Sequence, residues 1–484
     1  MAIRIYNTLT RAKEEFAPRE PGQVAMYVCG VTSYAPAHLG HGRSAVAFDV
    51  VRRWLLHRGY AVTFVYNITD VEDKIIAAST REERGWKELA EGYTEDLVRD
   101  LAALNVLPAS AMPRASEHIA EIISLIETLI AQGHAYPLDG DVAFHVPSFP
   151  EYGKLSKRDF DSQLAGARVE EDTRKRDPRD FFLWKGAKPG EPNWDSPWGP
   201  GRPGWHIECS AMSRKYLGDT FDIHGGGSDL IFPHHENEIA QSEAACQCQF
   251  ARYWMHNGML NLPAEGAGDT EKMSKSIGNV ISLSEAIRRT GGPALRYFCL
   301  AAHYGSAIPF TESALEQSQR ALERLRIARQ TLERLLAAPV KTGGEDLAEL
   351  AEVRVAAATD FEEAMDDDFN TPRALASLHG LVGALNRVSA SANVTFAPSQ
   401  AGHDTLAAVN RTLVDLAGVL GLDLQQETAA SHGLANDLMQ LLIEVRRQAR
   451  EAGQYAIADG IRARLGELGL ALEDRPDGTS WRRK

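Results

Sequence analysis

The sequence predicts an α/β protein, built on a Rossmann-type parallel-sheet core that is followed by helices. Three observations predict this class. A strand, a helix and a second strand succeed one another over residues 22–74, the α/β pattern resumes at residue 205 after an insertion, and the chain turns helical beyond residue 311. Because a chain of 484 residues is too long to fold around one compact hydrophobic core, we expect about three domains.

The first core unit is predicted to be a βαβ unit. Residues 23–28 form a short apolar run followed by glycine, and residues 61–66 are rich in β-formers. Between them, residues 42–58 carry apolar side chains at helical spacing, and Gly59 is placed to end the helix. Such a crossover joins parallel strands, so this unit predicts a parallel sheet that binds a nucleotide.

The rest of the expected catalytic domain, residues 1–311, contains an insertion at about 117–204 and a late segment at 258–311. Residues 84–133 have a helical pattern, whereas the stretch from 134 to 204 is rich in Pro, Gly and Trp, which is typical of short strands and long loops.

A helical bundle domain is predicted over residues 312–424, with one helix over 312–338 and another that begins at Asn370 or Thr371. The polar stretches 389–404 and 425–436 are interpreted as linkers.

The third domain is expected over 425–484 as a small module. Its final part, 437–484, is predicted to hold two amphipathic helices and a hairpin around Pro476–Gly478.

Composition and charge exclude several classes of protein. A net charge of −14 argues against nonspecific nucleic-acid binding, because that mode needs a broad positive field. No apolar run has the ~20 residues of a membrane helix, and the N-terminus lacks the apolar core of a secretory signal, so we expect a cytoplasmic location. Five cysteines favour reduced thiols over a disulfide framework, and Cys246 and Cys248 stand too close in sequence for an ordinary disulfide.

Two sequence strings indicate a nucleotide site. The string "HLGH" places His38 and His41 at the start of a helix, where phosphates bind, and Gly40 allows close approach to the backbone. In "EKMSKS", Lys272 and Lys275 provide the charge that a departing pyrophosphate needs. Each string alone is common in loops and surfaces. Together, in this order, they resemble the two signatures of class I aminoacyl-tRNA synthetases.

Four other side chains indicate a metal site. A helix is expected to begin near Pro233, so His234 and Glu238 would face the same way at i and i+4. Cys29 lies at the carboxyl end of the first strand, and two thiolates (with Cys209), an imidazole and a carboxylate suit tetrahedral zinc. The spacing alone also allows each residue to be an ordinary core or loop residue. A metalloprotease is excluded, because no second histidine completes an H-E-x-x-H motif.

A closer resemblance covers nearly the whole chain. The sequence resembles the cysteinyl-tRNA synthetase family in the strings "CGVTSYAPAHLGH", "NITDVEDKII", "RDPRDFFLWK", "GRPGWHIECSAMS", "DIHGGGSDLIFPHHENEIAQSEAA", "KMSKS", "MDDDFNTPRAL" and "ADGIRARLGELGLALEDRPDGTSWRR". The resemblance implies activation of cysteine with ATP and Mg²⁺, followed by transfer of cysteine to tRNA(Cys) by a monomeric enzyme.

Site residues follow from the resemblance. It implies one zinc ion held by Cys29, Cys209, His234 and Glu238. It further assigns ATP to His38, Gly40 and His41, the phosphates to Lys272 and Lys275, and the amino-acid pocket to Thr69, Trp205 and Asp229. A zinc–thiolate bond, which serine cannot form, would explain how cysteine is selected.

Two other readings of the sequence stay open. A cysteine ligase that passes the activated amino acid to an aminosugar would share the chain up to about residue 310 but lack the closing module. A noncatalytic RNA-binding relative is the other, although the intact histidine, lysine and metal-ligand positions argue against it.

Overall fold

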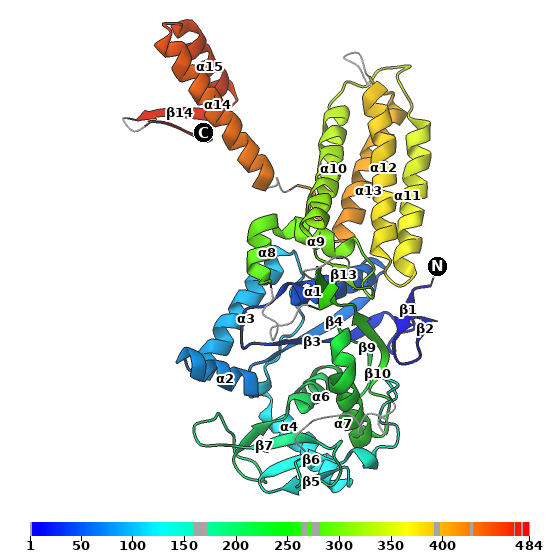
Figure 1. Ribbon diagram of the computed structural model, residues 1–484. Helices are drawn as coiled ribbons and strands as arrows, with labels where there is room; N and C mark the ends of the chain where they lie inside the picture. Colours follow the sequence, from blue (N-terminus) through cyan, green and yellow to red (C-terminus); the bar gives the residue numbers. More distant parts are fainter. Residues whose placement is uncertain are drawn as a thin grey trace. The chain divides into compact units, whose positions relative to one another are not determined.

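The structure is a computed structural model of the chain (Figure 1) that describes residues 2–158, 172–263, 270–272, 281–391, 397–425, 429–468, 470–475 and 478–483. Its contacts divide the chain into two compact units, Met1–Leu424 and Gln425–Lys484. Among the described residues, no helix is both long enough and apolar enough to cross a membrane.

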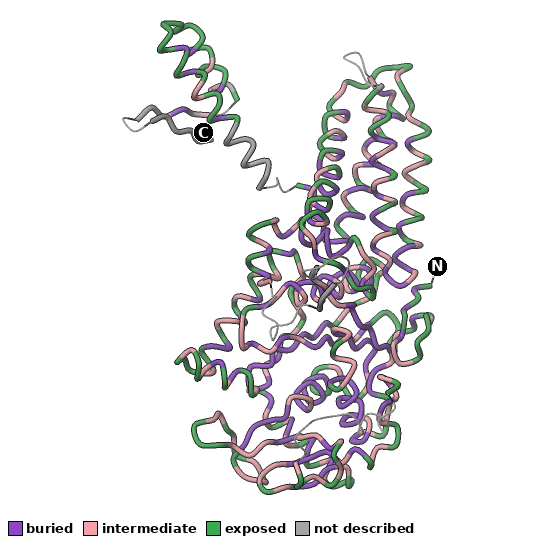
Figure 2. Tube along the Cα trace, in the orientation of Figure 1, coloured by how far each residue is buried: buried purple, intermediate pink, exposed green. Residues whose placement is uncertain are grey.

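A four-stranded parallel sheet forms the core of the first unit, in the order β10-β9-β3-β4. Its strands are β3 (Gln23–Thr32), β4 (Ala61–Thr69), β9 (Phe221–Gly227) and β10 (Ala251–Asn257). Most of their residues are buried (Figure 2), as expected when helices cover both faces of a parallel sheet. The predicted α/β fold class is confirmed, and both predicted strands of the βαβ unit extend a few residues further than the sequence suggested.

Helix α1 (Leu39–His57) makes the crossover between β3 and β4. It begins three residues before the predicted Gly42, because His38 and His41 form a reciprocal capping box at its start. The helix packs closely on the sheet at Gly225, where an added Cβ would lie 2.4 Å from the Phe48 ring. The middle of α1 is therefore held closely against the middle of β9.

The insertion forms a second, antiparallel sheet in the order β5-β6-β7-β8. Its strands are β5 (Ala135–Leu138), β6 (Asp141–Phe144), β7 (Phe181–Gly186) and β8 (Gly201–Pro203). The helices of this half of the chain are α2 (Asp73–Glu82), α3 (Trp86–Ala103), α4 (Ile119–Ala131), α6 (Trp205–Leu217) and α7 (Glu236–Cys246). The short strands that the sequence predicted for the insertion are confirmed.

Small strands complete the first unit. An N-terminal hairpin consists of β1 (Arg4–Asn7) and β2 (Ala12–Glu15). A three-stranded sheet in the order β12-β11-β13 contains β11 (Leu260–Pro263), β12 (Thr270–Lys272) and β13 (Ile308–Pro309). Helices α8 (Leu283–Thr290) and α9 (Gly292–Leu300) lie between β12 and β13 in sequence.

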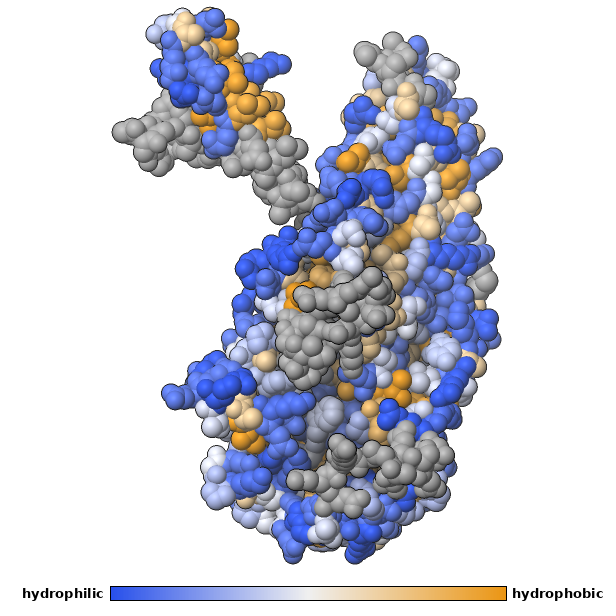
Figure 3. Space-filling model, in the orientation of Figure 1, coloured by the Kyte–Doolittle hydropathy of each residue, from blue (hydrophilic) through white to orange (hydrophobic). Residues whose placement is uncertain are grey.

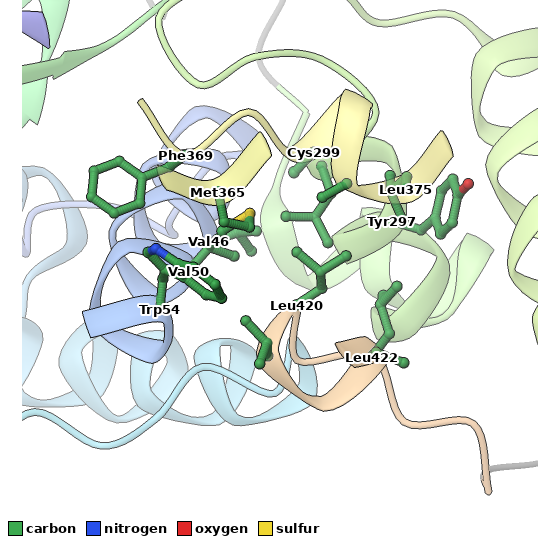
Figure 4. Close-up of a cluster of buried hydrophobic side chains, with 14 of the residues drawn as sticks. Val46, Val50, Trp54, Tyr297, Cys299, Met365, Phe369, Leu375, Leu420 and Leu422 are labelled. Atoms are coloured by element: carbon green, nitrogen blue, oxygen red, sulfur yellow. The ribbon is translucent and has the colours of Figure 1, made fainter. Parts of the chain in front are cut away.

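A bundle of four long helices stands on the core (Figure 1): α10 (Glu312–Leu336), α11 (Ala348–Asp366), α12 (Thr371–Ser391) and α13 (Gln400–Val419). Figure 4 shows its base, where side chains of α1 such as Trp54 meet Phe369 and Leu420. Residues 400–404, predicted to lie in a linker, are helical because Ser399 caps α13 through a bond from Gly402 N.

The second unit contains α14 (Ala429–Glu451), α15 (Tyr455–Glu467) and a hairpin of β14 (Leu470–Arg475) and β15 (Gly478–Arg483). The two predicted helices and the pairing of the two hairpin strands are confirmed, whereas Pro476 and Asp477 of the predicted turn lie outside the described residues. The predicted linker is wrong from residue 429, where α14 already begins. Figure 3 shows apolar side chains along the helix pair, and exposed leucines of α14 include Leu438 and Leu441.

One cysteine prediction is wrong. Cys246 and Cys248 form a disulfide at the end of α7, although the sequence interpretation favoured reduced thiols. Gln247, which separates them, adopts the left-handed conformation with φ 55°, and this turn brings the two Cα atoms to 5.2 Å. Cys29, Cys209 and Cys299 are free thiols, and all three are buried.

Candidate active site and metal centre

Four predicted ligands meet beside the core sheet. Cys29 comes from β3, Cys209 from α6, and Glu238 from α7, whereas His234 lies in the helical turn Ile231–His235 that precedes α7. One ligand atom of each residue lies within 4.8 Å of those of the other three. Residues separated by up to 209 positions in sequence are thus brought together by the sheet and the two helices.

The cluster is buried, and its ligand atoms lie close together. The Sγ atoms of Cys29 and Cys209 are 3.7 Å apart, and Cys29 Sγ lies 3.3 Å from Glu238 Oε1. His234 Nε2 is 3.1 Å from the same carboxylate oxygen. All four residues are buried, with exposed fractions of 7% or less. Such a set of potentially anionic groups, crowded away from water, suits a divalent cation.

Burial changes the titration of these groups. Burial raises the pKa of the Cys29 thiol well above its usual value, and the neighbouring Cys209 and Glu238 raise it further. Burial lowers the pKa of His234 to about 3, so its imidazole is neutral at pH 7 and able to bind a metal. A cation between the sulfurs would reverse the effect on the thiols and favour thiolates.

Two further histidines adjoin the cluster, and the sequence interpretation missed both. His224 Nε2 lies 2.9 Å from Glu238 Oε2, and His235 lies close enough to form a second possible ligand set with Cys29, His224 and Glu238. His235 has a signal in sequence, because it follows His234 directly. His224 has none, since only the pairing of β9 with β3 brings it to this place.

The three residues predicted for the amino-acid pocket have different positions. The Trp205 ring stacks on His234 with ring centres 4.4 Å apart, so it borders the metal cluster. Thr69 ends β4 and donates its hydroxyl to the buried carboxylate of Glu208, the neighbour of Cys209. Asp229 is exposed in the turn Ser228–Leu230 after β9.

The predicted nucleotide residues lie at the start of α1. The rings of His38 and His41 stack with centres 3.7 Å apart, and the backbone N of His38 donates to His41 Nδ1 at 3.2 Å. An added Cβ at Gly40 would approach the His38 ring to 3.0 Å. Lys272 ends β12, and Lys275 lies outside the described residues.

The turn that holds the histidines is joined to the residues just after the lysine string. Leu39 N donates to Ile281 O at 3.1 Å, and Leu283 N donates to Ala37 O at 2.8 Å. The histidine turn and residues 281–283, which follow the lysine string in sequence, therefore belong to one region of the fold.

Family models match three parts of the chain. Residues 15–320 match the family described as tRNA synthetases class I (C) catalytic domain. Residues 360–425 match the DALR domain, and residues 435–482 match the cysteinyl-tRNA ligase anticodon binding domain.

The full-length relatives of this chain are named cysteine–tRNA ligase. The cysteine–tRNA ligase of Heliobacterium modesticaldum is 50% identical, and that of Geobacter sulfurreducens is 48% identical, each over 100% of both chains. Among solved structures, the methionyl-tRNA synthetase of Mycobacterium tuberculosis in complex with methionyl-adenylate has a TM-score of 0.60 at 17% identity, covering 82% of this chain and 91% of that one, which supports the fold alone. The chain belongs to the cysteine–tRNA ligase family, within the class I aminoacyl-tRNA synthetases.

Proposed function

We propose that the protein activates cysteine with ATP, releasing pyrophosphate, and then transfers cysteine from the adenylate to the 3′ end of tRNA(Cys). The observation that carries this proposal is the convergence of Cys29, Cys209, His234 and Glu238 within 4.8 Å, in the same domain as the histidine turn. The identity to named cysteine–tRNA ligases over the full chain supports it.

These four residues are proposed to hold one zinc ion. Their donor set and burial fit zinc, which takes sulfur, nitrogen and oxygen ligands in a compact shell. When bound, zinc supplies a soft acceptor for the thiolate of the substrate. The Trp205 ring stacks on His234 and so borders this place.

Selection of cysteine over serine is the task of this centre. A pocket that recognises shape alone separates near-isosteres only ~10- to 200-fold. Translation needs about 10⁴-fold, which corresponds to about 5.5 kcal/mol. Since hydroxyl groups bind soft metals weakly, a thiolate contact supplies the difference in the first step.

ATP, with Mg²⁺, is proposed to bind at the start of α1. The N-terminus of this helix offers backbone N–H groups and a positive dipole to the phosphates, and His38 and His41 project from its first turn. Gly40 leaves room for the adenosine beside the backbone. Lys272 and Lys275 are proposed to stabilise the charge that grows on the departing pyrophosphate.

The amino-acid pocket is proposed to include Thr69, Trp205 and Asp229. Thr69 donates to Glu208, the sequence neighbour of the proposed ligand Cys209, and Trp205 stacks on the proposed ligand His234. Asp229, exposed after β9, offers a carboxylate to the ammonium group of cysteine.

The domains are proposed to divide the work. Residues 1–311 carry out the chemistry, residues 312–424 form the supporting bundle, and residues 425–484 read the anticodon. In this last module Arg450 is exposed, whereas Arg446 is buried and Arg447 pairs with Glu444 and Glu451. We propose that the enzyme works as a cytoplasmic monomer.

Exchange of pyrophosphate into ATP tests the first step. The expected result is exchange that depends on cysteine and is at least ~10³-fold weaker in kcat/KM with serine. Comparable exchange with serine would remove the selection argument. Measuring transfer of cysteine to tRNA and to an aminosugar then distinguishes the two acceptors. Transfer to the aminosugar alone would show that the protein is the aminosugar ligase instead.

A further inference from the structure

Arg43 is a buried cation two residues beyond His41 on α1. Only 1% of its surface is exposed. Its guanidinium donates to three backbone carbonyls, those of Met259 at 2.6 Å, Tyr304 at 3.2 Å, and Ser306. These acceptors lie more than 200 residues away in sequence, so one side chain joins α1 to two distant segments.

Those carbonyls lie where β11 and β13 begin to pair. Met259 directly precedes β11, and its carbonyl also accepts from Ile308 N at 3.0 Å. The Tyr304 carbonyl accepts from Gly258 N at 2.8 Å. Arg43 therefore reinforces the junction from which β11 starts.

Strand β11 is the partner of β12, the strand that ends at Lys272. It pairs antiparallel with β12, and Asn261 lies opposite Lys272. Only Leu260 thus separates Met259, whose carbonyl Arg43 binds, from Asn261, which faces Lys272. On the other side of the string, the backbone of Ile281 and Leu283 bonds to the histidine turn.

We propose that Arg43 is a positioning residue for the ATP-dependent step. It fixes the start of β11, and through the pairing of β11 with β12 the backbone of Lys272, relative to His38 and His41. This inference rests on the proposed function of both strings. Arg43 touches neither substrate in this role, because it is enclosed by the carbonyls that it binds.

The choice of arginine agrees with this role. Burial lowers the pKa of Arg43 to about 10, so the side chain remains a cation at neutral pH. Burying a cation on neutral carbonyls costs free energy that an apolar side chain would avoid. The planar fork, however, reaches three carbonyls in fixed directions, whereas a lysine offers one point charge. Arginine at this position thus defines geometry rather than maximising stability.

Arg296 of α9 provides a matched control. It is also fully buried, and it donates to the carbonyls of Leu420 at 2.7 Å, Leu104 at 3.0 Å and Asn105 at 3.1 Å. These bonds tie α9 to the base of the bundle and to the end of α3. None of these bonds reaches β11 or β13.

The experiment compares Arg43→Lys with Arg296→Lys in the full-length protein. For Arg43→Lys, kcat of cysteine-dependent pyrophosphate exchange should fall by ~10²-fold, since misplacing a catalytic group by about 1 Å has an effect of that size. KM for cysteine should change less than about 2-fold. Both substitutions should lower the melting temperature by similar amounts. Arg296→Lys, however, should leave kcat within about 2-fold of the wild-type value.

A second variant tests the same junction without altering the arginine. An added Cβ at Gly258 would lie 2.4 Å from the Ser306 carbonyl oxygen, so Gly258→Ala pushes the two segments apart. It should lower kcat as Arg43→Lys does. If Arg43→Lys fails to fold, the kcat of Gly258→Ala still tests whether this junction matters for the ATP-dependent step.

Equal kcat losses in Arg43→Lys and Arg296→Lys, or an unchanged kcat in both Arg43→Lys and Gly258→Ala, would overturn the inference. A wild-type protein without exchange would instead overturn the proposed function, so the two failures are distinguishable.

Discussion

The Glu238 carboxylate contacts three other side chains of the proposed metal centre or next to it. Its Oε1 atom faces Cys29 and His234, and its Oε2 atom lies 2.9 Å from His224. Because His224 contacts one carboxylate oxygen, the other oxygen stays directed at the proposed metal position, as is usual for metal ligands with hydrogen-bonded partners. His224 therefore orients a proposed ligand without being one of the four.

Cys209→Ser should reduce bound zinc well below one ion per chain, because a neutral hydroxyl replaces a thiolate. Elemental analysis of purified protein measures it. Cys299→Ser is the matched control, since Cys299 is also a buried free thiol but belongs to α9. Undiminished zinc in Cys209→Ser would exclude this residue from the centre.

Lys275→Ala should slow adenylate formation by ~10²- to 10³-fold while cysteine affinity stays nearly unchanged, because the lysine is proposed to act on charge that develops only in the transition state. Single-turnover kinetics and equilibrium binding measure the two effects. Lys13→Ala serves as control, since Lys13 pairs with Asp367 at 2.8 Å in the N-terminal hairpin. A loss of cysteine affinity at full rate would contradict the assignment.

Individual site residues were predictable where a string carried them. Cys29, Cys209, His234 and Glu238 were chosen as one set, and the fold brings all four together. His224 and Arg43 were not predicted, because neither has a local pattern. The position of His224 arises from the register of β9 with β3, and the contacts of Arg43 are with carbonyls more than 200 residues away.

At the scale of elements, local patterns predicted the helices better than their ends. Apolar spacing indicated α1, yet its first turn depends on a cap formed by two histidines, which are unusual capping residues. The linker interpretation of residues 425–436 was wrong from residue 429 onward for a related reason. Polar residues in α14 were read as a flexible chain, although a helix with an exposed face is equally polar.

Asp49 links several elements around α1, and Asp49→Ala should destabilise them. Its carboxylate accepts from Leu107 N at 2.8 Å and from the buried guanidinium of Arg296. Removing it leaves a buried cation uncompensated, which costs about 3–5 kcal/mol. Thermal unfolding should show a clearly lower midpoint.

The control for this prediction is Asp96→Ala, because Asp96 forms an exposed ion pair with Arg99 at 2.6 Å. Exposed pairs contribute about 0–1 kcal/mol, so its midpoint should barely move. Similar shifts in both variants would show that Asp49 has no special structural role.

At the scale of the whole molecule, the chain offers a clean division at residue 424. Residues 425–484 form a compact unit of their own, so a protein that ends at Leu424 keeps the internal contacts of the first unit. Pyrophosphate exchange should therefore remain within about 2-fold of the full-length value. Charging of tRNA should fall severely, because the proposed anticodon contacts are gone.

Aminoacylation with purified tRNA(Cys) measures this second effect. The full-length protein and the truncated one are compared at equal exchange activity, so that loss of folding is not mistaken for loss of recognition. Unimpaired charging by the truncated protein would refute the role of the module and reopen the small-acceptor reading.

The order of strands in the core sheet also determines when it is completed during synthesis. Strand β3 pairs with β4, its near neighbour in sequence, and with β9, which follows β4 by about 150 residues. At ~5–20 residues per second, a ribosome needs roughly 8–30 s to produce that interval. The antiparallel sheet β5–β8 emerges meanwhile from contiguous sequence. Until β9 appears, one edge of β3 has no partner, so the nascent chain exposes unpaired backbone N–H and C=O groups for many seconds. Protection by a chaperone is most useful during that period.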